Sequence, residues 1–305
     1  MPTAHPTIKG VLSPVVTPFL PDLQPDTEKF IQHCKWLIDN GVGLAIFGTN
    51  SEATSLSLQE RLELLEALLE AGVDPRRLMP GTGCCSLPET VQLTRHAVNA
   101  GSAGVLMLPP FYYKGVSDDG LFRYFSEVIE RVDHPDLRLY LYHFPGVSQI
   151  PLSVGLIERL LKRYPTIVAG IKDSSGDWNS MKAYIDNFAA EGFDVFPGTE
   201  THLLNALRAG GAGCISATAN VNPAQISGVY RNWKDSDIET ENANMVEIRQ
   251  IFQRYPLLPA MKKTIAVSRN DPQWAMLRPP LEPLPDSDYQ TLAQELKQAG
   301  FSLAS

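Results

Sequence analysis

The sequence lacks the features of several large classes of protein. Of its 305 residues only four are cysteine, and no apolar run approaches the ~20 residues that a membrane-spanning helix needs. The 26 basic residues are outnumbered by 34 acidic ones, which gives a net charge of −8, and they form no Lys/Arg cluster. A protein that binds a polyanion needs such a cluster to release counterions. We therefore expect no nucleic-acid partner and no membrane partner.

The cysteines and histidines follow no metal-ligand or disulfide spacing. Cys84 and Cys85 are adjacent, Cys34 and Cys214 lie far from them, and the six histidines form no H-x-x-x-H pair. We expect no metal site, and we interpret the cysteines as buried thiols in a reducing cytosol. Residues 1–9 show no basic-then-apolar leader pattern, which favours a cytoplasmic protein.

Two common site motifs are absent as well. No G-x-S-x-G elbow is present, which weakens a serine hydrolase interpretation. The first apolar run continues at 13–18 as SPVVTP, without the Gly-rich fingerprint that follows the first strand of a dinucleotide-binding sheet. This absence weighs against a doubly wound open sheet, which is the main alternative fold.

Short apolar runs alternate with amphipathic stretches along the chain, most of the runs bounded by Gly, Pro or Thr. Eight such runs, each followed by a helical pattern, predict an α/β fold in which a parallel sheet closes into a (β/α)8 TIM barrel. The runs are Gly10–Val16, Gly43–Phe47, Leu78–Gly81, Gly104–Leu108, Arg138–His143, Ile167–Ile171, Asp194–Phe196 and Gly211–Ser216.

The ends of several helices are readable from capping residues. Ser57 followed by Glu60 is a capping box, in which each side chain satisfies a free backbone donor of the other residue. Ser117, Ser153 and Asp177 are further candidate N-caps.

The pattern changes after Trp233. Residues 1–233 are predicted to form the barrel, and residues 234–305 a C-terminal helical extension packed on it. Three helices are expected in the extension, at about 239–255, 261–266 and 286–300, with a Pro-rich linker at 278–284 before the last one.

The most informative window is residues 166–175, an apolar run that leads to Lys172. Reactive residues of such barrels lie at the carboxyl ends of the strands. Strand alternation predicts Val168, Gly170 and Lys172 on one face, with Gly170 leaving room beneath a lysine at the pocket floor. Burial disfavours the ammonium, and a neutral amine attacks a ketone to form an imine. The alternative is a lysine that only reaches solvent at a strand end.

Two further windows hold candidate polar groups. Tyr142 ends the preceding run, and a phenol there can move protons to and from a bound carbonyl; the alternative is an ordinary core tyrosine. Residues 47–53 (FGTNSEA) offer hydroxyls, an amide and backbone N–H groups that can hold a carboxylate, unless they form only a polar loop. His143 points to the opposite face and is interpreted as a packed or surface histidine rather than a base.

Taken together, these windows resemble the dihydrodipicolinate synthase and N-acetylneuraminate lyase superfamily of pyruvate-dependent class I aldolases. Residues 48–52 (GTNSE) resemble the family's G-[ST]-T-G-E loop, and residues 142–145 (YHFP) its Y-N-x-P. Residues 170–177 (GIKDSSGD) resemble G-x-K-[DE]-[ST]-S-G-D, which holds the family's Schiff-base lysine. The likeness runs from Gly10 to about Leu284.

The resemblance implies roles for four catalytic residues. Lys172 would form a covalent imine with the keto carbon of pyruvate or another 2-oxo acid, so that no separate cofactor is needed. Tyr142 would donate and accept the proton, and Thr49 would stand in a hydroxyl relay with it. Tyr113 best matches the third relay member, a tyrosine lent by a neighbouring subunit. The family therefore implies a homotetramer built as a dimer of dimers.

The resemblance also implies binding residues. The backbone of Thr49 and Asn50 would hold the 2-oxo acid carboxylate, and Gly198 and Ile215 would line the pocket through main-chain groups. Asn50 and Ser51 depart from the Thr-Gly that is usual at these places in the family.

A further departure concerns the second substrate. Residues 146–151 (GVSQIP) lack the arginine with which true dihydrodipicolinate synthases hold that substrate's carboxylate. We therefore expect a Schiff-base carbon–carbon lyase or aldolase that acts on a 2-oxo acid and a different aldehyde. The alternatives are 4-hydroxy-tetrahydrodipicolinate synthase of lysine biosynthesis itself, a 2-keto-3-deoxy sugar acid dehydratase or aldolase, and a non-catalytic 2-oxo acid binder.

Overall fold

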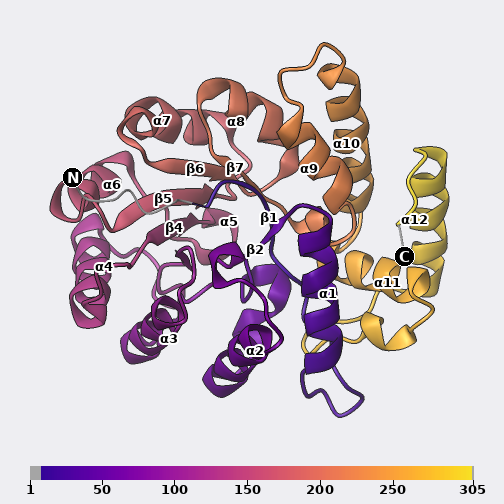
Figure 1. Ribbon diagram of the computed structural model, residues 1–305, viewed down its shortest axis with the longest axis horizontal. Helices are drawn as coiled ribbons and strands as arrows, with labels where there is room; N and C mark the ends of the chain where they lie inside the picture. The colour runs from indigo at the N-terminus through magenta and orange to yellow at the C-terminus, as the bar shows by residue number, and fades with distance from the viewer. Residues whose placement is uncertain (1–7, 304–305) are drawn as a thin grey trace.

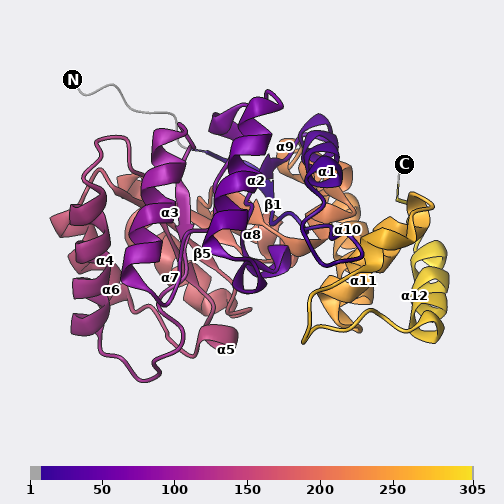
Figure 2. The ribbon, with the colours of Figure 1, turned by 90° about the horizontal axis from the view of Figure 1, so that it is seen from below.

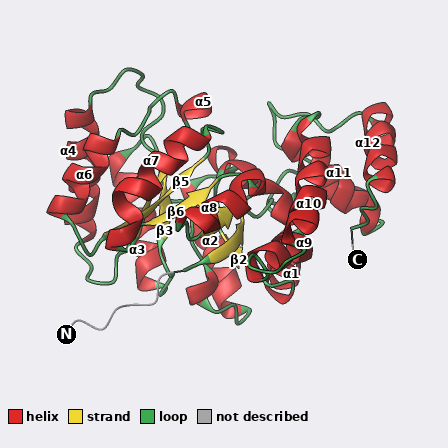
Figure 3. Cartoon of the chain, turned by 90° about the horizontal axis from the view of Figure 1, so that it is seen from above, coloured by secondary structure: helices red, strands yellow, loops and turns green. Residues whose placement is uncertain are grey.

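Parallel strands form the centre of the molecule, and helices surround them, in the computed structural model, which describes residues 8–303 (Figure 3). Two stretches of sheet are hydrogen-bonded, one in the order β2-β1-β7 and the other in the order β3-β4-β5-β6. The strands are β1 Gly10–Ser13, β2 Gly43–Leu44, β3 Val105–Met107, β4 Leu139–His143, β5 Val168–Asp173, β6 Asp194–Pro197 and β7 Gly213–Ile215.

The ring of strands is completed at two places by isolated β-bridges or hydrogen bonds rather than by full ladders. Residues 78–81 stand between β2 and β3 through the parallel bridges Leu44–Leu78 and Gly81–Leu106. The amide of Ala212 donates to the carbonyl of Val195 at 3.0 Å, which joins β7 to β6. The seven strands and the bridged segment make the eight parallel positions of the predicted TIM barrel, so the fold class is confirmed.

One part of the predicted alternation is wrong. The register between β4 and β5 shifts after the Leu139–Val168 pair, so that Tyr140 pairs with Gly170. This bulge exchanges the two faces of the strand for the residues before Gly170. Val168 therefore packs outside the barrel, among the residues under the helices, and Ala169 packs against the interior cluster. That interior cluster consists of Leu12, Ala45, Met79, Leu106, Tyr140, Tyr142, Phe196, Ala212 and Ile215.

Gly170 leaves room, but for a different side chain than predicted. A Cβ atom there would lie 2.7 Å from Cδ1 of Tyr140, so the space is filled by the Tyr140 ring. The Tyr140 hydroxyl in turn donates to a carboxylate oxygen of Asp194 at 3.1 Å.

The helices around the barrel begin where their capping residues predict. Ser57 and Glu60 form the reciprocal capping box of α2, and Ser117, Ser153 and Asp177 cap α4, α6 and α7 through their side chains. The helices are α1 Thr27–Asp39, α2 Leu58–Glu70, α3 Leu87–Asn99, α4 Asp118–Val132, α5 Pro145–Ser148, α6 Val154–Arg163, α7 Trp178–Phe188, α8 Leu203–Ala209 and α9 Pro223–Arg231.

Three C-terminal helices lie beside the barrel next to α1 and α9 (Figures 1 and 2). They are α10 Ile238–Gln253, α11 Leu257–Ser268 and α12 Asp286–Gln298, close to the predicted positions. A second apolar core joins them to the barrel, because Val16, Ala217 and Val221 pack in one cluster with Phe252 and Met261. The boundary at residues 233/234 stays a prediction.

All four cysteines are free, but only Cys34 and Cys214 are buried as expected. Cys84 and Cys85 are half-buried because they follow the short segment 78–81 into a loop. No helix within residues 8–303 combines the length and the apolar character that crossing a bilayer requires. The expectation for the leader segment falls mainly on residues 1–7, which lie outside the described residues.

Candidate active site

Lys172 and Tyr142 meet where β4 and β5 end. The two residues are register partners on these neighbouring strands. The Lys172 Nζ atom donates to the Tyr142 hydroxyl at 3.3 Å and lies 4.3 Å from the centre of the Tyr142 ring. Both side chains are buried, with exposed fractions of 2% and 4%. The barrel thus holds an amine and a phenol in contact inside a mostly apolar interior.

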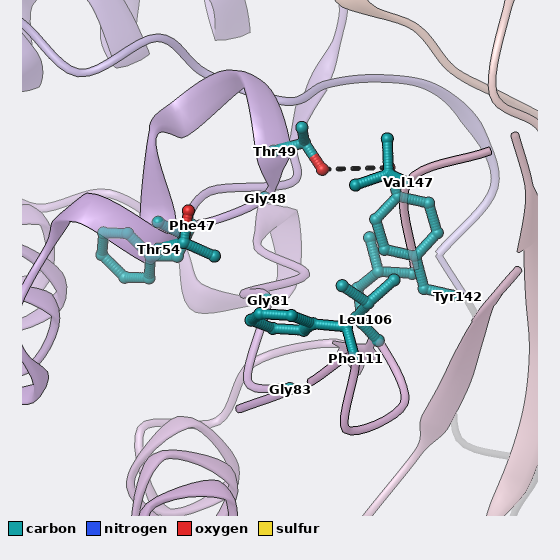
Figure 4. A pocket seen from close by; sticks show the side chains of 12 residues that line it. Phe47, Gly48, Thr49, Thr54, Gly81, Gly83, Leu106, Phe111, Tyr142 and Val147 are labelled. Atoms are coloured by element: carbon teal, nitrogen blue, oxygen red, sulfur yellow. Dashed lines mark hydrogen bonds between the residues drawn. The ribbon is translucent and has the colours of Figure 1, made fainter. Parts of the chain in front are cut away.

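Thr49 adds a second hydroxyl to this pair. It begins the short 3₁₀ turn Thr49–Ser51 after β2, and its Oγ1 atom lies 3.4 Å from the Tyr142 hydroxyl (Figure 4). The Ser51 hydroxyl accepts a hydrogen bond from the Gly48 amide at 3.2 Å, which closes the turn. Three of the predicted catalytic residues, Lys172, Tyr142 and Thr49, are therefore brought together.

The fourth predicted catalytic residue lies away from them. Tyr113 is 67% exposed and packs edge-on against Tyr112, with ring centres 5.4 Å apart, in the loop before α4. Lys114 from the same loop donates to the carbonyls of Phe111 and Ser148, the latter at 3.0 Å. Tyr113 is not among the residues that line the cavity beside Tyr142.

The predicted binding residues surround the pair in different ways. Ile215 is fully buried in the interior cluster, and Asn50 is half-buried in the 3₁₀ turn beside Thr49. The Gly198 amide already donates to the Asp173 carbonyl at 2.7 Å, so the Gly198 carbonyl is the main-chain group that remains to contact a ligand. A side chain at Gly198 would collide with Ser174, so the close approach requires glycine.

Of the two alternatives predicted for His143, a packed or a surface residue, the structure shows the packed one. Its Nδ1 atom accepts from the Leu152 amide at 3.0 Å, and its ring packs edge-on against Tyr184. Burial lowers the pKa of His143, with Asp173 acting in the opposite direction. No group of three or more His, Cys, Asp or Glu side chains within residues 8–303 is arranged to hold a metal ion.

A buried ion pair lies beneath the Thr49 turn, and the sequence gives no indication of it. Lys262 of α11 donates to a Glu52 carboxylate oxygen at 2.9 Å and to the Thr17 carbonyl at 2.8 Å. The Thr17 hydroxyl donates to the Ser51 carbonyl at 2.7 Å, and the Arg278 amide donates to the other Glu52 oxygen at 3.0 Å. Burial lowers the pKa of Lys262, and Glu52 opposes this shift.

A second buried polar cluster lies at the ends of β6 and β7. The Glu200 carboxylate accepts from the hydroxyls of Ser216 and Thr218, and Arg249 of α10 lies 3.5 Å from it. The sequence gives no sign that Arg249, on a later helix, reaches Glu200. Spacing along one chain cannot reveal a partner brought in by tertiary packing.

A cavity of about 210 Å³ opens beside the Thr49–Tyr142 pair (Figure 4). Its walls come from the loop after β2, the loop after residues 78–81, the end of β3 and the short helix α5. The lining residues are Phe47, Gly48, Thr49, Ala53, Thr54, Gly81, Gly83, Leu106, Leu108, Phe111, Tyr142 and Val147.

Comparison with known proteins identifies relatives of this chain over nearly its whole length. The model of the dihydrodipicolinate synthetase family matches residues 7–299. An uncharacterized DapA-like lyase of Chloroflexus aurantiacus is 32% identical over 287 residues, covering 93% of this chain and 94% of that protein. A 4-hydroxy-tetrahydrodipicolinate synthase of Methanococcoides burtonii is 30% identical over 298 residues, covering 96% and 98%.

Two solved structures extend the comparison. Dihydrodipicolinate synthase of Agrobacterium tumefaciens superposes with a TM-score of 0.88 at 30% identity, covering 96% of this chain and 99% of that chain. YagE of E. coli K12, a prophage protein of the dihydrodipicolinic acid synthase family in complex with pyruvate, superposes with a TM-score of 0.86 at 29% identity. The match covers 97% of this chain and 99% of that chain.

The fold and site define a TIM-barrel protein with a lysine and a tyrosine at neighbouring strand ends. The chain belongs to the dihydrodipicolinate synthetase family. The expected family, and the enzyme class of lyases and synthases that it comprises, are both confirmed.

Proposed function

We propose that the protein is a Schiff-base lyase or aldolase that makes or breaks a bond between pyruvate, or a related 2-oxo acid, and an aldehyde. The observation that carries this proposal is the contact of 3.3 Å between the buried Lys172 amine and the Tyr142 hydroxyl. A buried amine beside a proton donor has what imine formation requires. YagE, a relative in structure, holds pyruvate, which supports a 2-oxo acid as the first substrate.

The reaction begins on Lys172. Its neutral amine adds to the keto carbon of pyruvate, and the hydroxyl of the resulting carbinolamine takes a proton from solvent and leaves as water, so that a cationic imine remains. The Tyr142 hydroxyl then takes a proton from C3 as its own proton passes to Thr49 and on to solvent, and the enamine forms. The enamine carbon attacks the aldehyde carbon, and the proton returns to the new alkoxide. Water then hydrolyses the imine, which releases a 4-hydroxy-2-oxo acid and restores the lysine.

The carboxylate of the 2-oxo acid binds to the amides of Thr49 and Asn50. The first N–H groups of a helical turn have no acceptor within the turn, so they are available to an anion. Gly198, through its carbonyl, and Ile215 complete the wall around the keto acid. No metal and no separate organic cofactor takes part, because the cationic imine itself acts as the electron sink.

Tyr113 acts in the site of a neighbouring subunit. This assignment is supported by its 67% exposure and by its absence from the lining of the cavity beside Tyr142. A residue that is exchanged between two copies across an isologous interface completes both sites at once. The assembly is then a homotetramer made of two such dimers, working in the cytoplasm.

Synthesis of 4-hydroxy-tetrahydrodipicolinate is the second candidate function, favoured by the name of the Methanococcoides burtonii relative. Val147, in the segment after Tyr142 where an arginine would be needed, lines the cavity instead. Turnover with aspartate semialdehyde as the preferred aldehyde would establish this second candidate in place of the first.

Turnover by single variants tests the proposal. Cleavage of 4-hydroxy-2-oxo acids is measured as the rate at which pyruvate is released. The unaltered protein is compared with Lys172→Ala and with the control Lys182→Ala, because Lys182 lies on the surface of α7, paired with Asp186. We expect Lys172→Ala to lose all activity with its circular dichroism spectrum kept, and Lys182→Ala to remain active. Undiminished turnover by folded Lys172→Ala would refute the proposal.

A further inference from the structure

The cavity beside Tyr142 has an uncharged wall. All twelve of its lining residues are apolar, glycine, threonine or tyrosine. Phe47, Leu106, Phe111 and Val147 line it from four different segments (Figure 4). Such a wall recognises a ligand by shape and apolar contact rather than by charge.

The cavity is continuous with the reacting groups but does not include the lysine. Thr49 and Tyr142 belong to its wall, whereas Lys172 touches Tyr142 and is not part of the lining. A molecule in the cavity therefore reaches the Tyr142 hydroxyl, which itself contacts Lys172. That is the position a second substrate needs.

Two cationic side chains that contact residues of the lining are already bonded to backbone carbonyls. Lys114 donates to the carbonyls of Phe111 and Ser148, and the Arg61 guanidinium donates to the Gly81 carbonyl. Neither side chain belongs to the lining. A carboxylate against the apolar part of this wall, away from the Thr49 and Asn50 amides that hold the 2-oxo acid, would lose its hydration without gaining a charged partner, so this part of the wall selects against acidic aldehydes.

We infer that the second substrate is an uncharged aldehyde with an apolar carbon chain, or in the reverse direction the 4-hydroxy-2-oxo acid made from it. This inference rests on the proposed function. Size limits the chain as well. A cavity of about 150 Å³ accommodates benzene, so 210 Å³ suits an aliphatic chain or a single aromatic ring.

A homologous series of aldehydes tests the inference. Trapping of pyruvate by borohydride is first verified, and kcat/KM is then measured with pyruvate and propanal, butanal, pentanal, hexanal and benzaldehyde. We expect kcat/KM to rise about threefold to fourfold for each added methylene until the cavity is full, the factor that corresponds to burying one such group. Succinic semialdehyde and glyceraldehyde serve as the acidic and the hydroxylated competitors, and both should be poor substrates.

Val147 provides a variant that reverses the preference. It lies on α5, 53% exposed, at the edge of the cavity, so Val147→Arg brings a guanidinium to the mouth. We expect this variant to favour succinic semialdehyde over pentanal by at least about tenfold more than the unaltered protein does, because a charged partner is now present. Val267→Arg is the control, since Val267 is similarly exposed (52%) but lies on α11, outside this cavity.

The outcomes separate the two claims. If pyruvate is trapped but succinic semialdehyde or glyceraldehyde is preferred over the apolar aldehydes, the inference is wrong and the proposed function stands. An equal change of preference in Val147→Arg and Val267→Arg also contradicts the inference. If pyruvate is not trapped at all, the proposed function fails, and the inference fails with it.

Discussion

Lys262 and Glu52 form an ion pair of 2.9 Å in which neither side chain is exposed to solvent. The pair joins α11, near the C-terminus, to the residue that follows the Thr49 turn. Glu52 adopts a left-handed backbone conformation, with φ of 55°, which is uncommon for a residue other than glycine. The C-terminal helices therefore hold in place the loop on which the proposed carboxylate site is built.

Removing this lysine should destabilise the protein strongly. In Lys262→Met the Glu52 carboxylate stays buried without a charged partner, and we expect a loss of about 3–5 kcal/mol in the free energy of unfolding. Because the Thr49 turn then loosens, half-maximal trapping of pyruvate should require a higher pyruvate concentration. Urea denaturation and a trapping titration measure the two effects.

The adjacent lysine is the matched control. Lys263, on the same helix as Lys262, pairs at 2.7 Å with the exposed Asp286 of α12, so Lys263→Met should change the free energy of unfolding little. Equal stability of the two variants would show that the buried pair does not hold the loop.

Tyr142→Phe should separate imine formation from turnover. The phenyl ring keeps its packing beside Lys172, but the proton-transferring hydroxyl is gone. We expect pyruvate still to be trapped on the lysine, while kcat falls by roughly 10²- to 10⁴-fold, the usual contribution of a general acid–base group. Turnover unchanged in Tyr142→Phe would remove Tyr142 from the mechanism.

Mixed assemblies test whether Tyr113 acts in the neighbouring subunit. Lys172→Ala and Tyr113→Phe should each have little activity alone. Unfolding and refolding them together in equal amounts creates dimers in which one site has both intact residues. Random pairing then restores about a quarter of the full activity, since half of the dimers carry one complete site. If mixing restores nothing although mass spectrometry detects mixed assemblies, Tyr113 acts within its own chain or not at all.

His33 should make stability depend on pH. It is fully buried between α1 and the C-terminal region, with Arg269 2.8 Å from Nδ1 and Asn220 3.3 Å from Nε2. Burial, and then the charge of Arg269, lower the pKa of His33 to about 3.

The direction of this effect follows from the two pKa values. The unfolded chain binds a proton below pH 6.5 and the folded chain only near pH 3. The contribution of neutral His33 to the free energy of unfolding is therefore complete above pH 6.5. It is lost as the pH falls below this value, by up to about 1.4 kcal/mol per pH unit. Urea denaturation between pH 7 and 5 should show this slope, and His33→Gln should show less of it. Identical slopes in the two proteins would contradict the assignment.

Much of the barrel was predictable because its signals are local. The apolar runs, the capping box at Ser57 and the N-cap Ser153 depend on residues close in sequence. The strand ends at Lys172 and Tyr142 were equally local, and barrel geometry then brings neighbouring strand ends together. The bulge in β5 was not predictable, since it depends on how Tyr140 and Asp194 fill the space at Gly170.

The buried polar pairs were not predictable for a related reason. Lys262 is one lysine among several in the C-terminal third, and Glu52 lies 210 residues away from it. Nothing in the local sequence distinguishes Lys262 from the exposed Lys263 beside it. The same holds for Arg249, which meets Glu200 only after the helices have packed.

The central claim is that Lys172 forms an imine with a 2-oxo acid. The most direct test is to incubate the protein with pyruvate and borohydride, digest it, and locate the reduced adduct by mass spectrometry of the peptides. The account predicts an adduct on Lys172. An unmodified Lys172, or an adduct on another lysine such as Lys262, would contradict it.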